Sequence, residues 1–190
     1  MVNDRVVTGK SHDQLGGATS SGEFGSILQT IFDPRSGAEF GYSSLVRLGR
    51  PNGERVAYRL TFRVPEHLYR IEDRDSGRSV SVGYHGFVWA DRETSSILKI
   101  TFDCDDIPAD FPVHALSLSM NYDFVEISGQ KFALPIQSDL KSRQDRYLSW
   151  NELRFANYRK FGTESTITFD TPEAVAPEKL GEKPATIKKQ

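Results

Sequence analysis

The clearest pattern in this chain is the alternation of apolar and polar residues, which predicts β-strands. In residues 97–102, apolar side chains alternate with Lys99 and Thr101. That period of two is expected of a strand with one face buried. The preceding run, 87–90, is apolar on both faces, so it fits a central strand that is covered on each side. The polar residues 91–96 are a suitable turn between the two, which gives a β-hairpin.

Further alternating segments predict a sheet of eight or nine strands joined by short turns. The most regular is 56–64, which Pro65 ends because proline cannot donate a backbone hydrogen bond. The short runs 68–71 and 79–82 flank a polar turn. Strands that follow one another through short turns pair antiparallel, and a sheet this long curls. The other segments with strand patterns are 38–48, 115–127, 131–140, 150–161 and 165–169.

A short amphipathic helix is predicted at residues 21–32. Ser20 and Glu23 have the spacing of a capping box, and apolar residues then recur at helical spacing. The helix ends at Asp33 because the residue before Pro34 disfavours the helical conformation. Its polar face has no basic stripe, which favours packing on a core over binding to a membrane. The predicted fold class is therefore mainly β, a curved antiparallel sheet or half-barrel with one helix on its concave side.

One β domain with flexible ends is the simplest organisation for 190 residues. Residues 1–19 are polar and rich in glycine, so we expect a flexible segment there. Residues 171–190 combine Pro, Glu and Lys with few large apolar side chains, which is typical of disorder. The domain itself is expected at 20–170, which is long enough to bury a core without disulfides or metals.

The composition argues against several classes of function. The net charge is −2, from 24 basic and 26 acidic side chains, which disfavours general binding to nucleic acid or to anionic membranes. Cys104 is the single cysteine, so no intramolecular disulfide and no cysteine-based metal cluster can form. No apolar run is long enough for a transmembrane helix. The first residues lack a signal-peptide pattern, so we expect either a cytoplasmic protein or a piece of a longer precursor.

Two clusters of charged residues are candidate sites. Arg55, Arg59 and Arg63 alternate with other residues along one predicted strand. We expect them on a solvated face, paired with acidic residues of neighbouring strands, although such a row also suits a track for phosphate groups or nucleic acid. Residues 73–77 begin like a calcium-binding loop, but Tyr84 stands where the distal glutamate is needed. A hairpin turn is therefore the favoured interpretation of that segment.

A further cluster contains the side chains that a hydrolase or a metal site would need, namely Asp103, Asp105, Asp106 and His114. Two prolines nearby indicate a surface loop, in which aspartates commonly cap turns. We therefore assign no catalytic residue, no metal and no cofactor. Cys104 has no basic neighbour in the sequence, so an ordinary half-buried thiol is favoured over a nucleophile.

The order of several motifs resembles a known family. In chain order, the motifs are SSGEFGSILQTIFD, YHGFVWADRETSSILKI, DIPADFP, YDFVEISGQKFALP and NELRFANYRKFGTESTITF. Together they resemble a family of acidobacterial proteins and are similar to the LolA-like superfamily of lipoprotein carriers. The resemblance implies a curved antiparallel sheet around a hydrophobic cavity that helices cover. It also implies a location in the periplasm or cell envelope, and a signal peptide with further strands upstream. It implies no catalytic residues.

Three functions are compatible with these features. The first is a non-enzymatic envelope protein that binds a lipid, a lipoprotein or another apolar ligand on the concave face. The alternative is an envelope module for protein interaction or sensing that has a solid core. The third is a hydrolase that uses the aspartates and the histidine named above. The oligomeric state stays open. The residues predicted for the apolar ligand face are Tyr58, Leu60, Phe62, Phe87, Trp89, Leu98 and Ile100.

Overall fold

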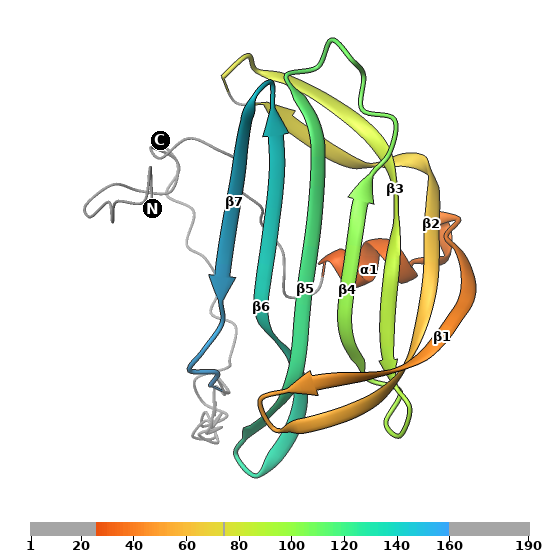
Figure 1. Cartoon of the computed structure of the whole chain (residues 1–190), viewed down its shortest axis with the longest axis vertical. Helices are drawn as coiled ribbons and strands as arrows, with labels where there is room; N and C mark the ends of the chain where they lie inside the picture. Colours follow the sequence, from red (N-terminus) through yellow and green to blue (C-terminus); the bar gives the residue numbers. More distant parts are fainter. Residues whose placement is uncertain (1–25, 74, 160–190) are drawn as a thin grey trace, which may run out of the picture. The chain divides into compact units, whose positions relative to one another are not determined.

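A computed structural model describes residues 26–73 and 75–159, which form one antiparallel sheet and one short α-helix (Figure 1). The helix α1 spans Ser26–Phe32, and a short 3-10 helix, η2, spans Pro34–Ser36. The seven strands of this part of the chain are β1 (Glu39–Arg50), β2 (Gly53–Asp73), β3 (Arg78–Asp91), β4 (Ile97–Cys104), β5 (Val113–Ile127), β6 (Gln130–Gln144) and β7 (Tyr147–Arg154).

The sheet is a meander in which each strand pairs antiparallel with the next strand in the sequence. In the described sheet, β1 and β7 are therefore the edge strands. The sheet is curved and open, which confirms the predicted fold class (Figure 1). The hairpin predicted from residues 87–102 is formed by β3 and β4, with the polar residues 92–96 between them.

The part of the chain that the structure describes forms seven strands, and the strand predicted at 165–169 lies outside it, so the predicted number of eight or nine strands is not contradicted. Two predicted breaks, however, lie inside continuous strands. Pro65 does not end a strand. β2 continues through it, and its register against β3 shifts between Val64 and Tyr69. Such an irregularity tolerates proline because the ladder is locally interrupted there. The runs 79–82 and 87–90 are likewise parts of the single strand β3.

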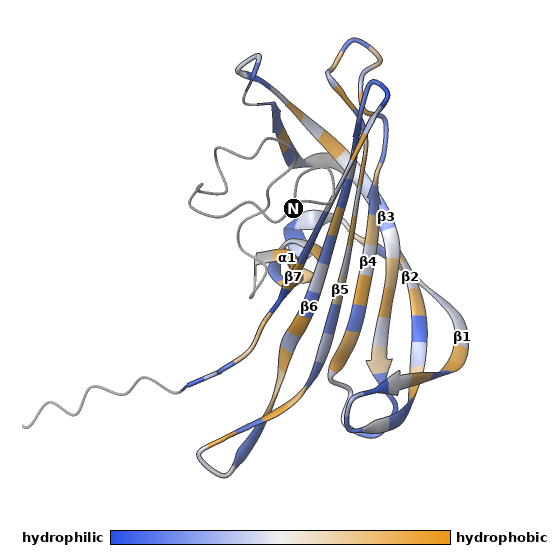
Figure 2. Ribbon diagram, turned by 60° about the vertical axis from the view of Figure 1, so that its left-hand side comes forward, coloured by the Kyte–Doolittle hydropathy of each residue, from blue (hydrophilic) through white to orange (hydrophobic). Residues whose placement is uncertain are grey.

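The helix α1 packs on the concave side of the sheet (Figure 2). Ile27 and Ile31 belong to the same buried cluster as the inward side chains of the strands. The helix ends at Phe32, as predicted, and Asp33 then caps η2 by accepting a hydrogen bond from the Arg35 amide. The sheet residues of the core include Phe62, Val64, Tyr84, Val88, Ile100, Phe102, Leu118 and Met120.

The tip of the β1–β2 hairpin bends over the face of the sheet that points away from α1 (Figure 1). Arg50 Nη2 donates to the Leu98 carbonyl oxygen at 2.8 Å, and Nη1 donates to Asn121 Oδ1 at 3.2 Å. Asn52 Nδ2 donates to Asp123 Oδ2 at 3.3 Å. These bonds connect the first hairpin to β4 and β5, which are not its neighbours in the sheet.

Some predictions concern residues outside the described part of the chain. These are the start of the helix predicted at 21–32, the flexible segment 1–19, the strand 165–169 and the tail 171–190. Within the described residues, no helix reaches the length and hydrophobicity of a membrane-spanning segment.

Candidate functional site

The seven residues predicted for an apolar ligand face lie on both faces of the sheet, so they do not form one surface. In the ladder, Val88 lies directly opposite Leu60 on one side and Ile100 on the other, and directly opposite residues point to the same face. That is the face covered by α1. Phe87 and Trp89 flank Val88 and therefore point away from α1. The sequence could not show this because the run is apolar on both faces.

Most of the α1 side of the sheet is already packed. Phe62, Leu98 and Ile100 are almost fully buried. The hollow between α1 and the sheet has a volume of about 20 Å³, which is room for about one water molecule. With α1 in place, this hollow is therefore too small for an acyl chain. The residues that line it are Ile27, Thr30, Ile31, Tyr69, Tyr84 and Phe102.

Beyond α1, the same face exposes a group of large apolar side chains, which we name the apolar patch. At the end of α1, the Phe32 ring stacks on the Phe40 ring of β1, with centroids 5.4 Å apart. The ladder places Leu45 directly opposite Tyr58. The exposed fractions of the patch residues lie between 41% and 67%. The alternation in β1 could not identify the patch, because it does not reveal which strand lies at the edge of a sheet. The patch consists of Phe32, Phe40, Tyr42, Leu45 and Tyr58.

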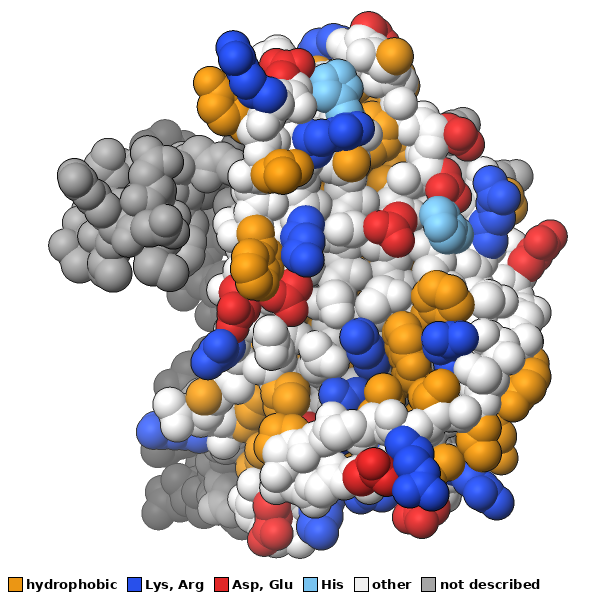
Figure 3. Space-filling model, in the orientation of Figure 1, with side chains coloured by type: hydrophobic (Ala, Val, Ile, Leu, Met, Phe, Trp, Pro, Cys, Tyr) orange, Lys and Arg blue, Asp and Glu red, His pale blue; other side chains and the backbone are white. Residues whose placement is uncertain are grey.

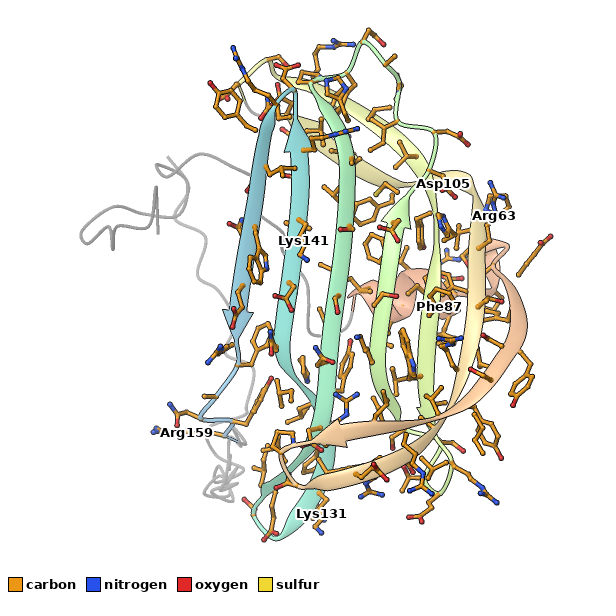
Figure 4. All side chains as sticks on the ribbon, in the orientation of Figure 1. Arg63, Phe87, Asp105, Lys131, Lys141 and Arg159 are labelled. Atoms are coloured by element: carbon orange, nitrogen blue, oxygen red, sulfur yellow. The ribbon has the colours of Figure 1, made fainter. Side chains whose placement is uncertain are left out.

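The structure does not bring the predicted acidic cluster together with His114. Asp105 Oδ1 lies 2.6 Å from His85 Nδ1, and its other carboxylate oxygen lies 3.8 Å from Arg63 Nη2 (Figure 4). His114 Nε2 instead contacts Asp145 at 3.2 Å. The sequence gives little sign of the His85–Asp105 contact, because the β-ladder brings the two residues together. Since proton-transfer groups must converge, this arrangement gives no support to the hydrolase hypothesis.

The remaining groups of this loop are exposed or unreactive. The side chains of Asp103 and Asp106 are exposed. Burial raises the pKa of the Cys104 thiol to about 12, and the neighbouring Asp103 and Asp105 charges act in the same direction. A thiol of this kind is a poor nucleophile at neutral pH. In the described part of the chain, no group of three or more His, Cys, Asp or Glu residues could hold a metal ion.

Between β2 and β3, residues 75–77 form a turn, as the favoured interpretation of this segment predicts. Asp73 Oδ2 accepts hydrogen bonds from the backbone amide and the hydroxyl of Ser76. Its Oδ1 accepts from Gln144 Nε2 at 3.4 Å. Gly77 has the left-handed conformation that such a turn requires, with φ of 67°. The Asp73 carboxylate therefore stabilises the turn.

Two arginines of the predicted row pair with acidic residues, as expected. Arg55 Nη1 lies 3.5 Å from a carboxylate oxygen of Asp91 and 3.5 Å from one of Glu93. Arg63 Nη2 contacts Asp105 at 3.8 Å. Arg59, the third arginine of the row, has no acidic residue within ion-pair distance among the described residues.

No known family model matches this chain, and no curated protein or solved structure is significantly similar to it. The resemblance to LolA-like carriers therefore rests on the sequence motifs alone.

Proposed function

We propose that this protein is a non-catalytic binding module that engages an extended segment of a partner protein on the apolar patch. The main support is the exposure of five large apolar side chains on one face of the sheet, beside a filled core. Contiguous apolar patches on a protein surface commonly mark interaction sites. The proposal corresponds to the interaction module with a solid core that the sequence offers as the alternative.

The position of the patch on β1 favours an extended partner. β1 is an edge strand of the described sheet, and unpaired strand edges accept further strands. Phe40 and Tyr42 occupy alternate positions of this strand, so a strand added here would place every second side chain beside the patch. The rings of Phe32 and Phe40 already stack on each other, which lowers the entropic cost of ordering them on binding.

Nuclear magnetic resonance with a synthetic peptide tests this proposal. The probe is a soluble peptide of about ten residues with alternating Val and Thr, long enough to cover one edge strand. We expect saturable shifts of the backbone amide signals of residues 39–50. Replacing Phe40 and Tyr42 together with serine should raise the Kd of the peptide at least about tenfold, because large aromatic side chains dominate such interfaces.

The other edge strand provides a matched control. Tyr147 and Leu148 of β7 are 71% and 82% exposed, and their double serine variant should bind the peptide as the unsubstituted protein does. Shifts of equal size on β7, or no response at residues 39–50, would contradict the proposal. A mass that rises with protein concentration in sedimentation, and returns to that of a monomer when Phe40 and Tyr42 are replaced, would instead show that a second copy covers the patch.

A second candidate function is binding of an acyl chain or a lipoprotein beneath α1, as the resemblance to envelope carriers implies. The observation that favours it is an aromatic surface under a helix of seven residues. The centroid of the Tyr84 ring lies within 6.0 Å of the ring centroids of Phe62, Tyr69 and Phe102. Because the hollow is only about 20 Å³, this function requires α1 to move away from the sheet.

Native mass spectrometry separates the second candidate from the first. The protein is expressed with export to a bacterial envelope, and bound material is then extracted with solvent and analysed. A stoichiometric acyl species would support binding beneath α1. An unliganded mass that does not change when fatty acid or lipopeptide is added would rule it out, and would leave the peptide experiment unaffected.

A further inference from the structure

The face of the sheet that points away from α1 has a row of residues aligned across four strands. Arg59 of β2 lies directly opposite Trp89 of β3, Trp89 lies opposite Lys99 of β4, and Lys99 lies opposite Asn121 of β5. Directly opposite residues point to the same face, so the four side chains form one strip. In Figure 3, Lys and Arg side chains lie among hydrophobic side chains on this face, beside the tip of the β1–β2 hairpin.

The tip of that hairpin adds a further cation to the strip. The guanidinium of Arg50 donates to the Leu98 carbonyl oxygen and to Asn121 Oδ1. Leu98 precedes Lys99 in β4, and Asn121 is the cross-strand partner of Lys99. Both contacts therefore place the guanidinium beside Lys99. We name Arg50, Arg59 and Lys99 the cationic cluster.

The cationic cluster lacks the acidic partners that arginines elsewhere on the sheet have. No carboxylate of the described residues lies within ion-pair distance of its three side chains. Arg59 Nε donates to Ser43 Oγ at 3.2 Å, and its guanidinium lies 5.2 Å from the centroid of the Phe87 ring. Arg50 Nε is buried and has no hydrogen-bond acceptor in this part of the chain. A buried donor without an acceptor is costly, so the charge of Arg50 is not fully compensated within the described residues.

Electrostatics at the cluster agree with this geometry. Desolvation lowers the pKa of Arg50, and the negative charge of Asp123 opposes this without forming an ion pair. Desolvation also lowers the pKa of Lys99, and the positive charge of Arg50 lowers it further, against a smaller effect of Asp139. The fold therefore destabilises two positive charges that lie beside each other. An anion between them would reverse that effect.

A second lysine–tryptophan pair lies on the same face and serves as a comparison. Lys141 Nζ lies 5.2 Å from the centroid of the Trp150 ring, the same distance that separates Lys99 Nζ from the Trp89 ring. Trp150 Nε1 donates to Asp139 Oδ1 at 2.9 Å, so a carboxylate lies at that pair. The Trp89 indole has no such carboxylate contact within the described residues, and the Asp139 charge acts on Lys99 without forming an ion pair.

We propose that the cationic cluster binds a small ligand through an oxyanion, a phosphate or carboxylate group, with at least two negative charges. Guanidinium and ammonium groups donate charge-assisted hydrogen bonds to such oxygens. Arg55 and Arg63, on either side of the cluster along β2, are paired with acidic residues, so Arg59 is the unpaired arginine between them. A strip of this length suits a small ligand better than a nucleic acid chain. The site lies on the opposite face from the apolar patch and does not depend on the proposed function.

The two tryptophans of the sequence give this proposal an internal control. Protein labelled with ¹⁵N is titrated with pyrophosphate and, separately, with citrate, while sodium chloride keeps the ionic strength constant. The indole N–H signals are assigned with the Trp89→Phe and Trp150→Phe variants. We expect the Trp89 signal to shift saturably and the Trp150 signal to stay in place.

Substitutions locate the binding groups. Lys99→Gln should raise the Kd of the anion at least about tenfold, because it removes a charged hydrogen-bond donor. Lys141→Gln, at the matched pair, should leave the Kd unchanged. Arg59→Gln is the second test variant and should weaken binding in the same direction, and far-ultraviolet circular dichroism verifies that each variant is folded.

The outcomes distinguish the alternatives. Saturation by pyrophosphate alone or by citrate alone supports the proposal and identifies the preferred group. A response that chloride reproduces at equal ionic strength would overturn it. Equal effects of Lys99→Gln and Lys141→Gln on the Kd, or equal shifts of both indole signals, would overturn it as well.

Discussion

Gly86 lies where the backbones of β3 and β4 approach each other most closely. A Cβ atom at this position would lie 1.9 Å from the Thr101 carbonyl oxygen and 2.7 Å from Phe102 Cα. Because both neighbours are backbone atoms, a side chain could fit only if the two strands moved apart. Glycine inside a strand commonly marks such a close approach of backbones.

Gly86→Ala should therefore destabilise the protein by at least about 3 kcal/mol, as expected for severe overpacking. Unfolding in urea measures the change. Gly49→Ala is the control, since a Cβ there would have no atom within 4 Å. It should change the free energy of unfolding by less than about 1 kcal/mol, because alanine also restricts the unfolded chain. If both variants lost similar amounts of free energy of unfolding, the close approach of the β3 and β4 backbones at Gly86 would not be the cause of the destabilisation.

Asp91 is a buried carboxylate at the turn between β3 and β4, with 2% of its surface exposed. Its Oδ1 accepts hydrogen bonds from the amides of Glu93 and Thr94, at 2.9 Å and 2.8 Å, and from the Thr94 hydroxyl. Burial alone would raise the pKa of Asp91. The hydrogen bonds from Thr94 and Glu93, with the charge of Arg55, outweigh burial and hold the pKa below its ordinary value of 3.8.

Asp91→Ala should lower the free energy of unfolding by about 2 kcal/mol at pH 7, because hydrogen bonds to an ionised acceptor are lost. A carboxyl with a lowered pKa in the folded state stabilises the protein above its unfolded pKa, and this contribution is lost as the pH falls through the folded pKa. The difference in urea midpoint between the unsubstituted protein and Asp91→Ala should therefore shrink below about pH 4. Asp110→Asn, at an exposed ion pair with Arg78, is the control and should leave the midpoint at pH 7 unchanged. If the difference in urea midpoint between the unsubstituted protein and Asp91→Ala did not depend on pH, the lowered pKa of Asp91 would be contradicted.

At the scale of elements, α1 is attached to the sheet through Ile27 and Ile31, of which Ile31 is the more deeply buried. Ile31 is 1% exposed and lies in the main hydrophobic cluster. Isolated helices of this length are unstable in water, so packing must hold α1 in its helical form. The sequence identified the end of this helix because its stop signal, Asp33 before Pro34, is local.

Ile31→Ala should destabilise the protein by about 2–4 kcal/mol, because it removes buried methyl groups and leaves a cavity. Gln29→Ala lies at an exposed position of the same helix. Its free energy of unfolding should stay within about 0.5 kcal/mol of that of the unsubstituted protein. Thermal and urea unfolding measure both variants. A negligible loss for Ile31→Ala would mean that α1 leaves the sheet readily, which would favour ligand binding beneath it.

The strands show which local signals are reliable. The β3–β4 hairpin was predictable because alternation and turn residues act over a few positions. Pro65 was misleading because a proline ends a strand only where the partner strand needs its N–H group. Whether that need exists depends on the register of β2 against β3, which shifts at this point.

At the scale of the molecule, the buried residues of the main hydrophobic cluster all come from the part of the sequence between Ile27 and Leu140. The sequence predicts that 1–19 and 171–190 lie outside the folded domain. A chain limited to residues 20–170 should therefore keep the urea midpoint and the circular dichroism spectrum of the full chain. A clear fall in the midpoint would show that an end segment contributes to the folded domain.

The sequence by itself determined the kinds of elements in this protein and their approximate positions along the chain. Alternation, helical spacing and turn residues act between neighbours in the chain, so they can be read without the fold. They also predicted that arginines of β2 would meet acidic partners, which holds for Arg55 and Arg63.

The tertiary structure alone decided which surfaces are available for function. Curvature of the sheet and the position of α1 bury Phe62 and leave Tyr42 exposed, although both positions have the same strand pattern. The bent tip of the first hairpin brings Arg50 to the Leu98 carbonyl, 48 positions along the chain. Such contacts depend on how strands far apart in the sequence are placed in space, and no periodicity along the chain records that placement.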